Sequence, residues 1–338
     1  MEAAQILHQL ARGRLITNLT VALVIVVLLG LGVGSLYSES LGYYRETITT
    51  FMVLFSIVLG LNVILGYTGY VSFGHAVFYG IGGYTAMVLM YYHGVNVYLA
   101  MLAAVLTAMG AAYLVGLIVL RLRGAYFAIA TIAVLEAFRV VAANVDYLGG
   151  SEGLQLSATY YRSYSIAEYH GLMAVHYIAY FLLVGVVALG LLINLYVSRS
   201  KFGAGLRAIR EDEDAAEAIG VNTWKYKTLA FVLSSITPAL AGAIIAWKRM
   251  IVLPGEFFNL GLSIEAIIST MLGGAGTVLG TITGTAIYHA VKTAFLTSFP
   301  SLHLVIFGAT IAVIAELLPM GIIGWLRIKS TKLRFLLE

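Results

Sequence analysis

Long apolar runs alternate with short polar segments along almost the whole chain of 338 residues. A helix that crosses the hydrocarbon core of a bilayer needs roughly 20 apolar residues. By this criterion the pattern predicts membrane-spanning helices, several of them short for a full crossing, at residues 17–36, 48–65, 70–92, 97–120, 125–143, 173–197, 229–247, 261–273, 277–297 and 302–318. We therefore expect one transmembrane domain over 1–338, an all-α polytopic bundle of about ten (eight to ten) helices, some of them short or broken.

Glycine interrupts this pattern within residues 60–86. In lipid, small residues let helices approach closely, and non-helical backbone survives at membrane depth only inside protein or beside a water-filled cavity. Because polar side chains are embedded in the same segment, we expect it to be interior, tightly packed and broken, near a path for a polar solute. The candidate residues for this path are Asn62, Tyr70, Ser72 and His75. For His75, a packing role is the alternative.

A second interruption follows the run 261–273, which leads into Gly273, Gly274 and Gly276. This spacing predicts a half-helix or a broken helix there. Within the run 125–143, Glu136 and Arg139 stand three residues apart. Because a charge at mid-membrane costs about 2.5–3.5 kcal/mol even on a lenient scale, we expect these two side chains to pair.

The composition is 61% hydrophobic and 11% charged, whereas soluble domains carry about 25% charged residues. Lys and Arg prefer the cytosolic side of a membrane. With the N-terminus inside, that side collects Arg12, Arg14, Arg121, Arg123, Arg199, Lys201, Arg207, Arg210, Lys225, Lys227, Arg327, Lys329, Lys332 and Arg334. The opposite side holds only Arg45, Arg162, Lys248 and Arg249. This asymmetry predicts a multi-pass plasma-membrane protein with both termini and residues 198–228 in the cytosol.

The first apolar run is long for a secretory signal, and no A-x-A-like cleavage site follows it, so we expect a retained helix. The largest segment on the outer side is the loop 144–172, which is rich in Tyr. Tyrosine suits both the aromatic belt of a membrane interface and a partly wet docking rim for an external partner. Both interpretations of this loop remain open.

Residues 198–228 form a charged island in this apolar chain. Asp212 or Asp214 can cap a short helix whose C-terminal end is Gly220, and upstream Leu206 and Ile209 share a face as exposed apolar contacts. One helix or two short ones are expected. A solvated connector is the bland interpretation, but the acid caps, small Ala face and Gly stop favour a docking element. Its candidate residues are Arg207, Arg210, Glu211, Asp212, Asp214, Ala215, Ala216 and Gly220.

Several chemistries have no motif in this chain. It has no Cys, its His residues never fall at the i, i+4 spacing of a helical zinc motif, and no GxxxxGK[ST] phosphate loop occurs. We therefore expect no catalytic residues, no metal site, no cofactor and no nucleic-acid partner for this chain. ATP, if it is used, would have to bind a separate subunit.

These stretches together resemble the permease subunits of ABC importers for branched-chain amino acids. Residues 60–86 resemble the glycine-rich segment of that family, and LRGAYFAIATIA with the following Gly149-Gly150-x-x-Gly153-Leu154 looks like the longer, LivM-type subunit. Asp214-Ala215-Ala216-x-x-x-Gly220 is similar to the EAA-x-x-x-G pattern of the cytosolic coupling loop. The likeness spans roughly 60–286. The chain departs at Tyr70, where the family commonly has Gln, and at Thr281, where it commonly has Pro.

The resemblance implies a permease that forms half of a translocation path and couples to ATPases through the island. The implied partners are a second homologous permease subunit, two cytosolic ABC ATPase subunits that bind ATP, an extracytoplasmic substrate-binding protein and the lipid bilayer. Urea or short amides are the alternative cargo. A secondary transporter driven by an ion gradient and a non-transporting scaffold are the competing classes. The first would need interior titratable groups such as Glu136, Glu265, His75, Lys292 and His289.

Overall fold

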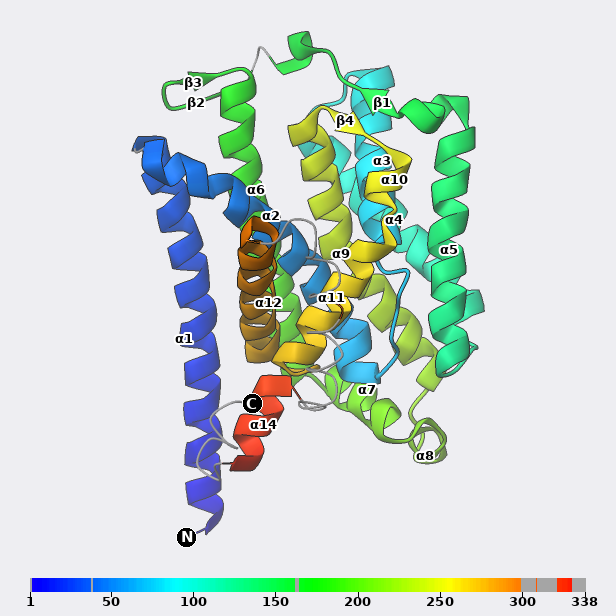
Figure 1. The fold of residues 1–338 in the computed structure, drawn as a ribbon. Coiled ribbons are helices and arrows are strands. Elements are labelled where there is room, and N and C mark those ends of the chain that lie inside the picture. The colour runs from blue at the N-terminus through cyan, green and yellow to red at the C-terminus, as the bar shows by residue number, and fades with distance from the viewer. Residues whose placement is uncertain (1, 38, 162–163, 299–307, 309–320, 330–338) are drawn as a thin grey trace.

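The computed structural model describes residues 2–37, 39–161, 164–298, 308 and 321–329, and this part of the chain is mostly helical (Figure 1). In it, six helices are long and apolar enough to cross a membrane. They are α1 (Glu2–Tyr37), α2 (Glu39–Leu61), α4 (Val97–Val119), α5 (Ala125–Asn144), α6 (Leu172–Arg199) and α9 (Thr223–Arg249). The other helices are α3 (Val77–His93), α7 (Lys201–Glu211), α8 (Glu213–Ala218), α10 (Pro254–Phe257), α11 (Leu260–Gly273), α12 (Val278–Ser298) and α14 (Gly321–Lys329). The protein is thus a multi-pass, all-α membrane protein, as predicted.

The described spans are fewer than the expected ten: six, or up to seven if the bent pair α11–α12 counts as one. The run 70–92 becomes helical only at Val77, because α2 ends in a π-helical turn, η1 (Asn62–Gly66), and the chain then turns through Gly69 at φ +77°. The chain bends by 119° between the segments Pro254–Gly273 and Val278–Ala294, which confirms the predicted break. The expected span 302–318 lies, except for residue 308, outside the described residues.

Helix α9 lies at the centre of the bundle and packs against α2, α3, α4 and α6. The α3–α9 crossing is close because glycine stands on both helices. A Cβ atom on Gly82 would meet the backbone of Ala239, and one on Gly242 would meet the carbonyl of Tyr79. A Cβ on Gly74, just before α3, would meet the Thr131 carbonyl of α5. The glycine-rich segment is therefore interior and tightly packed, as its sequence predicts.

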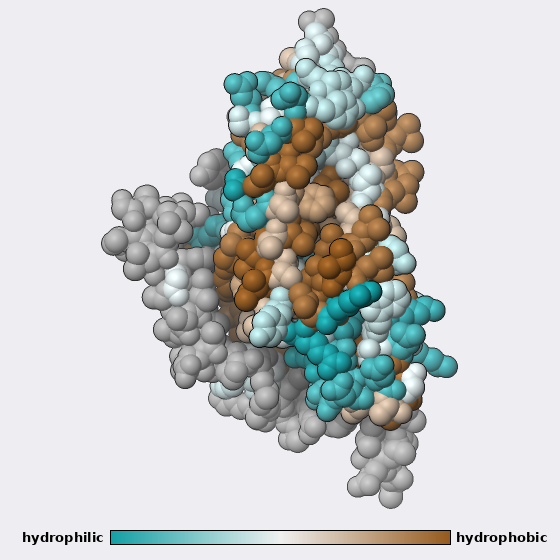
Figure 2. Space-filling view, turned by 90° about the vertical axis from the view of Figure 1, so that its right-hand side faces the viewer, coloured by the Kyte–Doolittle hydropathy of each residue, from teal (hydrophilic) through white to brown (hydrophobic). Residues whose placement is uncertain are grey.

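Helix α4 shows how the chain suits lipid. Its buried face is a stripe of small residues, whereas its large apolar residues are exposed. The stripe is Ala100, Ala104, Ala108, Ala112 and Gly116, and the exposed set includes Leu99, Leu102, Leu106, Leu114 and Ile118. Helices in lipid gain little by burying Leu against one another, so close contact between small residues decides which face turns inward. Figure 2 shows apolar side chains over the middle of one side of the molecule, with hydrophilic residues gathered towards both ends.

At one end of the molecule, the described part of the loop 144–172 contains three short 3-10 turns and three short strands, one of which pairs with a strand that follows α9. The turns are Asp146–Leu148, Gly150–Glu152 and Ala158–Tyr161. The strand pairs are β1 (Leu154–Gln155) with β4 (Ile251–Val252), and β2 (Ser165–Ile166) with β3 (Tyr169–His170). In their registers Leu154 faces Val252 and Ser165 faces His170.

The tyrosines of this loop bind backbone groups of the helix bundle. The hydroxyl of Tyr160 donates to the carbonyl of Val95 at 2.6 Å, Tyr161 to Trp247 at 2.8 Å and Tyr169 to Leu36 at 3.1 Å. Trp247 and Leu36 lie in the last turns of α9 and α1, where the carbonyls do not form the regular helical hydrogen bond. Among the loop tyrosines in the described residues, Tyr147 is the one that is mostly exposed. Three of these tyrosines therefore fasten the loop to the helix bundle, and the two interpretations of the loop stay predictions.

The Gly82 contact supports a stability prediction. Replacing Gly82 with Ala forces α3 and α9 apart and should destabilise the protein by about 1–3 kcal/mol, the usual cost of overpacking. Gly110 in α4 has open space where its Cβ would stand, so Gly110→Ala should be neutral or stabilising by up to about 1 kcal/mol. Thermal unfolding of the purified full chain measures both changes. Equal unfolding temperatures for the two variants would contradict the close crossing.

Candidate functional site

The charged island folds into two short helices, α7 and α8, at the end of the bundle opposite the small strands (Figure 1). Asp212 separates them and caps α8, because its Oδ1 accepts hydrogen bonds from the amides of Asp214 and Ala215, each at 3.0 Å. Gly220 follows α8 with φ +92°, a conformation that glycine adopts without strain. The predicted cap and stop are therefore confirmed. We refer to α7 and α8 together as the α7–α8 hairpin.

Leu206 and Ile209 were expected to be exposed, but they are buried beneath α7. The reason is that α7 packs back on α6 and α9 instead of extending into solvent. Ala216 is also buried, whereas Ala215 and Ile219 of α8 are exposed, Ile219 by 78%. The outer face of the hairpin therefore exposes fewer apolar residues than the sequence suggests, and much of this face belongs to α8.

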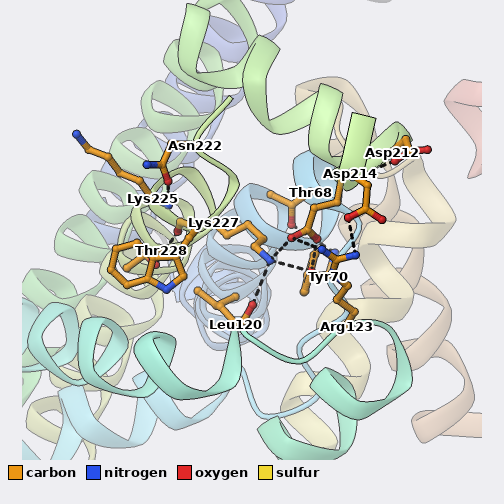
Figure 3. Close-up of polar contacts among 12 residues, drawn as sticks. Thr68, Tyr70, Leu120, Arg123, Asp212, Asp214, Asn222, Lys225, Lys227 and Thr228 are labelled. Atoms are coloured by element: carbon orange, nitrogen blue, oxygen red, sulfur yellow. Dashed lines mark hydrogen bonds and ion pairs between the residues drawn. The ribbon is translucent and has the colours of Figure 1, made fainter. Parts of the chain in front are cut away.

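A cluster of polar side chains, which we call the α8 junction, joins α8 to the bundle (Figure 3). Glu213 accepts hydrogen bonds from the Tyr70 hydroxyl at 2.6 Å and from the Lys227 ammonium at 2.6 Å. Lys227 also donates to Tyr70 at 3.0 Å and to the Leu120 carbonyl at 3.1 Å. Arg123 pairs with Asp214 at 2.9 Å and approaches Glu213 at 3.6 Å. The junction thus connects α8 to the segment before α3, to the α4–α5 turn and to the start of α9.

The central members of the junction are shielded from solvent. The Lys227 side chain is 4% exposed and the Glu213 side chain 13%. Burying an ion pair is weak evidence for added stability, but removing one partner leaves an uncompensated charge and costs about 3–5 kcal/mol. The junction therefore fixes where α8 begins relative to the bundle.

Burial raises the pKa of Glu213, but hydrogen bonds from Lys227 and Tyr70 and the charges of Lys227 and Arg123 lower it by more. The net pKa lies below the ordinary carboxyl value, so the ionised form is favoured. Its contribution to stability is complete above the unfolded-state pKa of about 4.3 and is lost as the pH falls through the lowered folded-state pKa.

Arg210 links the hairpin to both broken helices. Its Nη1 donates to the Gly66 carbonyl at the end of η1 at 2.6 Å and to the Ala275 carbonyl at the α11–α12 bend at 3.4 Å. Carbonyls released from a helix need a protein partner in this environment. Arg210 supplies one donor group to two such breaks, so a displacement of α7 acts on both.

Asn62, a predicted path residue, lies in a buried amide network at the same place. Its Nδ2 donates to Asn194 Oδ1 at 2.8 Å, and its Oδ1 accepts from the amide of Gly276 at 2.9 Å. Asn194 Nδ2 in turn donates to the Leu59 carbonyl at 2.9 Å. The network joins η1, α6 and the α11–α12 bend. In this conformation Asn62 stabilises the two breaks, and its role in a path stays a prediction.

The other predicted path residues lie between η1 and α3. Tyr70 belongs to the α8 junction, and its ring meets Phe127 edge to face at 5.0 Å. Ser72 and His75 are buried, and the Ser72 hydroxyl and both His75 ring nitrogens have no hydrogen-bond partner among the described residues. Their location at the break agrees with an interior site for a polar group, which also stays a prediction.

All of the predicted docking residues except the buried Ala216 are exposed. Arg207 Nη1 donates to the Ser198 carbonyl at 3.2 Å. Glu213, Lys227 and Arg123 were not predicted as site residues. Their charges were visible in the sequence, but Arg123 pairs with Asp214 across 91 positions and Lys227 with Glu213 across 14, and no local spacing indicates either contact.

A cavity of about 370 Å³, which we call the paired-charge cavity, lies among α2, α3, α9, α10, α11 and α12. Three ion pairs line it: Lys248–Glu46 at 2.5 Å, Arg249–Glu256 at 2.8 Å and Lys292–Glu265 at 2.5 Å. Apolar side chains complete the lining, namely Val53, Leu54, Ile245 and Leu262. Its described lining has equal numbers of cationic and anionic residues, with hydrocarbon beside them. None of the four predicted path residues lines this cavity.

The Glu136–Arg139 pair was predicted from spacing and is present on α5 at 2.7 Å. Both side chains are about half exposed, and neither lines the paired-charge cavity. The pair therefore shields its own charges at the surface of the bundle.

Known proteins resemble this chain over most of its length. Residues 43–315 match the family described as "Branched-chain amino acid transport system / permease component". The chain is 28% identical over 298 residues to the high-affinity branched-chain amino acid transport system permease protein LivM of Escherichia coli (strain K12), covering 82% of this chain and 69% of that protein.

Two further relatives cover less. The corresponding LivH permease of the same strain is 27% identical over 137 residues, which are 40% of this chain and 43% of LivH. A probable branched-chain amino acid transport permease protein LivM of Methanocaldococcus jannaschii is 24% identical over 197 residues, or 56% of this chain and 54% of that protein.

The α8 junction can be tested through its carboxylate. Glu213→Gln leaves Lys227 without its counter-charge and should destabilise the full chain by about 3 kcal/mol at pH 7. Glu217→Gln, an exposed change on the same helix, should cost less than about 0.5 kcal/mol. Unfolding of both variants and the parent is measured from pH 7 to pH 3.

Acidification should reduce the difference in free energy of unfolding between the parent and Glu213→Gln. The reason is that the parent loses the contribution of ionised Glu213 as the pH falls through its lowered pKa. If this difference stays constant, or grows towards low pH, the stabilising role assigned to ionised Glu213 is wrong.

Proposed function

The chain belongs to the family of permease components of branched-chain amino acid transport systems, and from this premise we propose that it forms half of the translocation path of an ATP-driven importer for branched-chain, hydrophobic amino acids. It is a transport subunit and not itself an enzyme. ATP would bind and be hydrolysed on separate subunits, and the chain would need no cofactor of its own.

The observation that carries the proposal is the construction of the α7–α8 hairpin. Its outer surface presents exposed charges and Ile219, a face suited to a protein partner. Its base is bound to the bundle by the α8 junction and by Arg210, which reaches both broken helices. A partner that moves α8 would therefore act on the segment before α3 and on the α11–α12 bend together. A solvated connector has no need of such attachments.

The paired-charge cavity supports the amino acid as cargo. A free amino acid carries one carboxylate and one ammonium, and a branched one adds an apolar side chain. The cavity offers cationic, anionic and apolar groups side by side, at no net charge among its described lining. Its internal ion pairs compensate one another when no solute is bound, which limits the cost of holding charges inside the protein. Urea has no charge to exchange with these pairs.

The partners that we propose follow from the family. They are a second homologous permease, for which the LivH likeness is the support, two cytosolic ABC ATPases on the α7–α8 hairpin, and an extracytoplasmic binding protein at the opposite end. The protein would lie in the plasma membrane with both termini and residues 198–228 in the cytosol, as the Lys and Arg asymmetry indicates.

A secondary transporter is the competing class, and Glu265, Lys292 and His289 of its expected titratable groups do line the paired-charge cavity. A gradient-driven mechanism, however, provides no reason for the α7–α8 hairpin or for its attachment through the α8 junction and Arg210. In membrane vesicles with saturating ATP, an ionophore that abolishes leucine uptake would favour the gradient-driven mechanism. Uptake of urea without leucine would favour the alternative cargo.

Coupling can be tested on the exposed face of α8. The double change Ala215→Trp with Ile219→Arg should reduce ATP-dependent leucine uptake at least about tenfold, equivalent to about 1.4 kcal/mol, by blocking the docking surface. Ala216 is unsuitable because it is buried. Lys225→Gln, an exposed change outside the hairpin, should keep uptake within about twofold. Unchanged uptake and ATP hydrolysis in a stable double variant would refute docking on this face.

The cargo site can be tested by removing one ion pair as a unit. Glu265→Gln together with Lys292→Met leaves no lone buried charge, so the chain should still fold. The KM for leucine should rise about tenfold, the effect of losing about 1.4 kcal/mol of binding. Glu136→Gln with Arg139→Met, which removes a pair away from the cavity, should leave KM unchanged. Equal KM values in both double variants would place the cargo elsewhere.

A further inference from the structure

A second charged cavity lies at the hairpin end and differs from the first in its charge. It has a volume of about 510 Å³ and lies between α1, the α6–α7 connection and the start of α12. We call it the basic cavity. Its charged lining residues are Arg14, Arg199, Lys201 and Arg207, and among the described residues that line it none is acidic. The described lining is therefore uniformly cationic.

These four cations also lack carboxylate partners in the described part of the chain. Arg199 Nη2 donates to the amide oxygen of Asn18 at 2.7 Å, and Arg207 donates to the Ser198 carbonyl. Neither contact neutralises charge. The cations of the α8 junction and of the paired-charge cavity, by contrast, lie beside carboxylates. Four cations gathered without an anion favour an anionic ligand from outside the chain.

Backbone groups of the same cavity also favour an anion. Helix α7 begins at Lys201 after its cap Ser200, and α12 begins at Val278, and residues of both helix starts line the cavity. Helix N-termini carry partial positive charge and free amides. Hydroxyl groups of Thr17, Ser198, Ser200 and Thr277 also line the cavity, but each already donates to a nearby backbone carbonyl. The four cations and the two helix starts suit a phosphate group.

The depth of the basic cavity identifies the kind of phosphate. The apolar run of α1 begins at residue 17, just after Arg14, and α6 ends at Arg199. Arg14 and Arg199 thus lie at the boundary between hydrocarbon and headgroups, where the phosphates of a phospholipid lie. Clustered basic residues at this boundary attract anionic lipids.

A neighbouring hollow of about 540 Å³ extends the basic cavity along the membrane-facing side. It shares Arg199 and Ser200 with the cavity and is otherwise lined by Asn18, Leu192, Leu195 and Tyr196. Leu192 and Tyr196 are exposed by 58% and 66%. Because this hollow lies next to the phosphate site and along a spanning helix, it suits an acyl chain. A free ion would leave it empty.

We propose that the basic cavity binds the headgroup of an anionic phospholipid, with an acyl chain lying in the adjoining hollow along α6. The bound lipid bridges α1, the start of α7 and the start of α12. It holds the first turn of the hairpin at the membrane surface, so the position of α7 depends on the lipid composition around the protein. The inference does not depend on the cargo or on ATP.

Thermal unfolding of the purified full chain tests this site. Long-chain phosphatidylglycerol should raise the unfolding temperature and remain bound in native mass spectra, whereas phosphatidylcholine at the same concentration should not. Inorganic phosphate and dihexanoyl phosphatidylglycerol should give little or none of the gain. If inorganic phosphate reproduces the full gain, the cavity is a free-anion site and the lipid proposal is overturned.

Variants locate the site. Arg199→Gln with Arg207→Gln should reduce retained phosphatidylglycerol at least about fivefold and abolish the rise in unfolding temperature. Arg121→Gln removes an exposed cation from the same end outside the cavity and should retain both. If the double variant does not fold, Lys201→Gln, an exposed position, should still weaken retention about twofold. Retention equal to that of the parent in the folded variant would overturn the assignment.

Discussion

The structure depends on one constraint of the bilayer: a backbone group that leaves a helix at membrane depth must find its partner within the protein. The chain leaves its helices at η1 and at the α11–α12 bend, and it brings the two breaks together. Arg210 donates to a carbonyl of each, and Asn62 accepts the amide of Gly276. Two defects that would each be costly alone thus share one set of partners.

Through these contacts the α7–α8 hairpin is attached to both helix breaks. Arg210 belongs to α7, so the donor that stabilises the breaks is also part of the hairpin. The α8 junction adds a second attachment, in which the charge of buried Lys227 lies beside that of Glu213 only while α8 keeps its place. A displacement of the hairpin must exchange these bonds or move their partners. For a transport subunit that would be driven from outside, such bonds provide a route from the surface to the interior.

The two cavities differ in how their charged side chains are arranged. In the paired-charge cavity each cation stands beside an anion, which suits a solute that carries both signs and leaves an empty site neutral. In the basic cavity cations stand together at the edge of the hydrocarbon. Unpaired charge is tolerable there because water and headgroups are near, whereas a charge enclosed by protein and left without a partner would be costly.

The sequence by itself determined the all-α membrane architecture, the break after residue 273, the close packing of residues 60–86 and the two caps of the hairpin. These features follow from apolar periodicity, from glycine and from short-range hydrogen bonds, all of which neighbouring residues specify. Only the tertiary structure decided the number of spanning helices in the described part, the burial of Leu206 and Ile209, and the inward turn of the loop tyrosines. It also decided that Tyr70, Arg123, Glu213 and Lys227 meet. Those outcomes depend on which distant segments share a low-dielectric interior, and there a charge or a free carbonyl takes whatever partner the packing brings within reach.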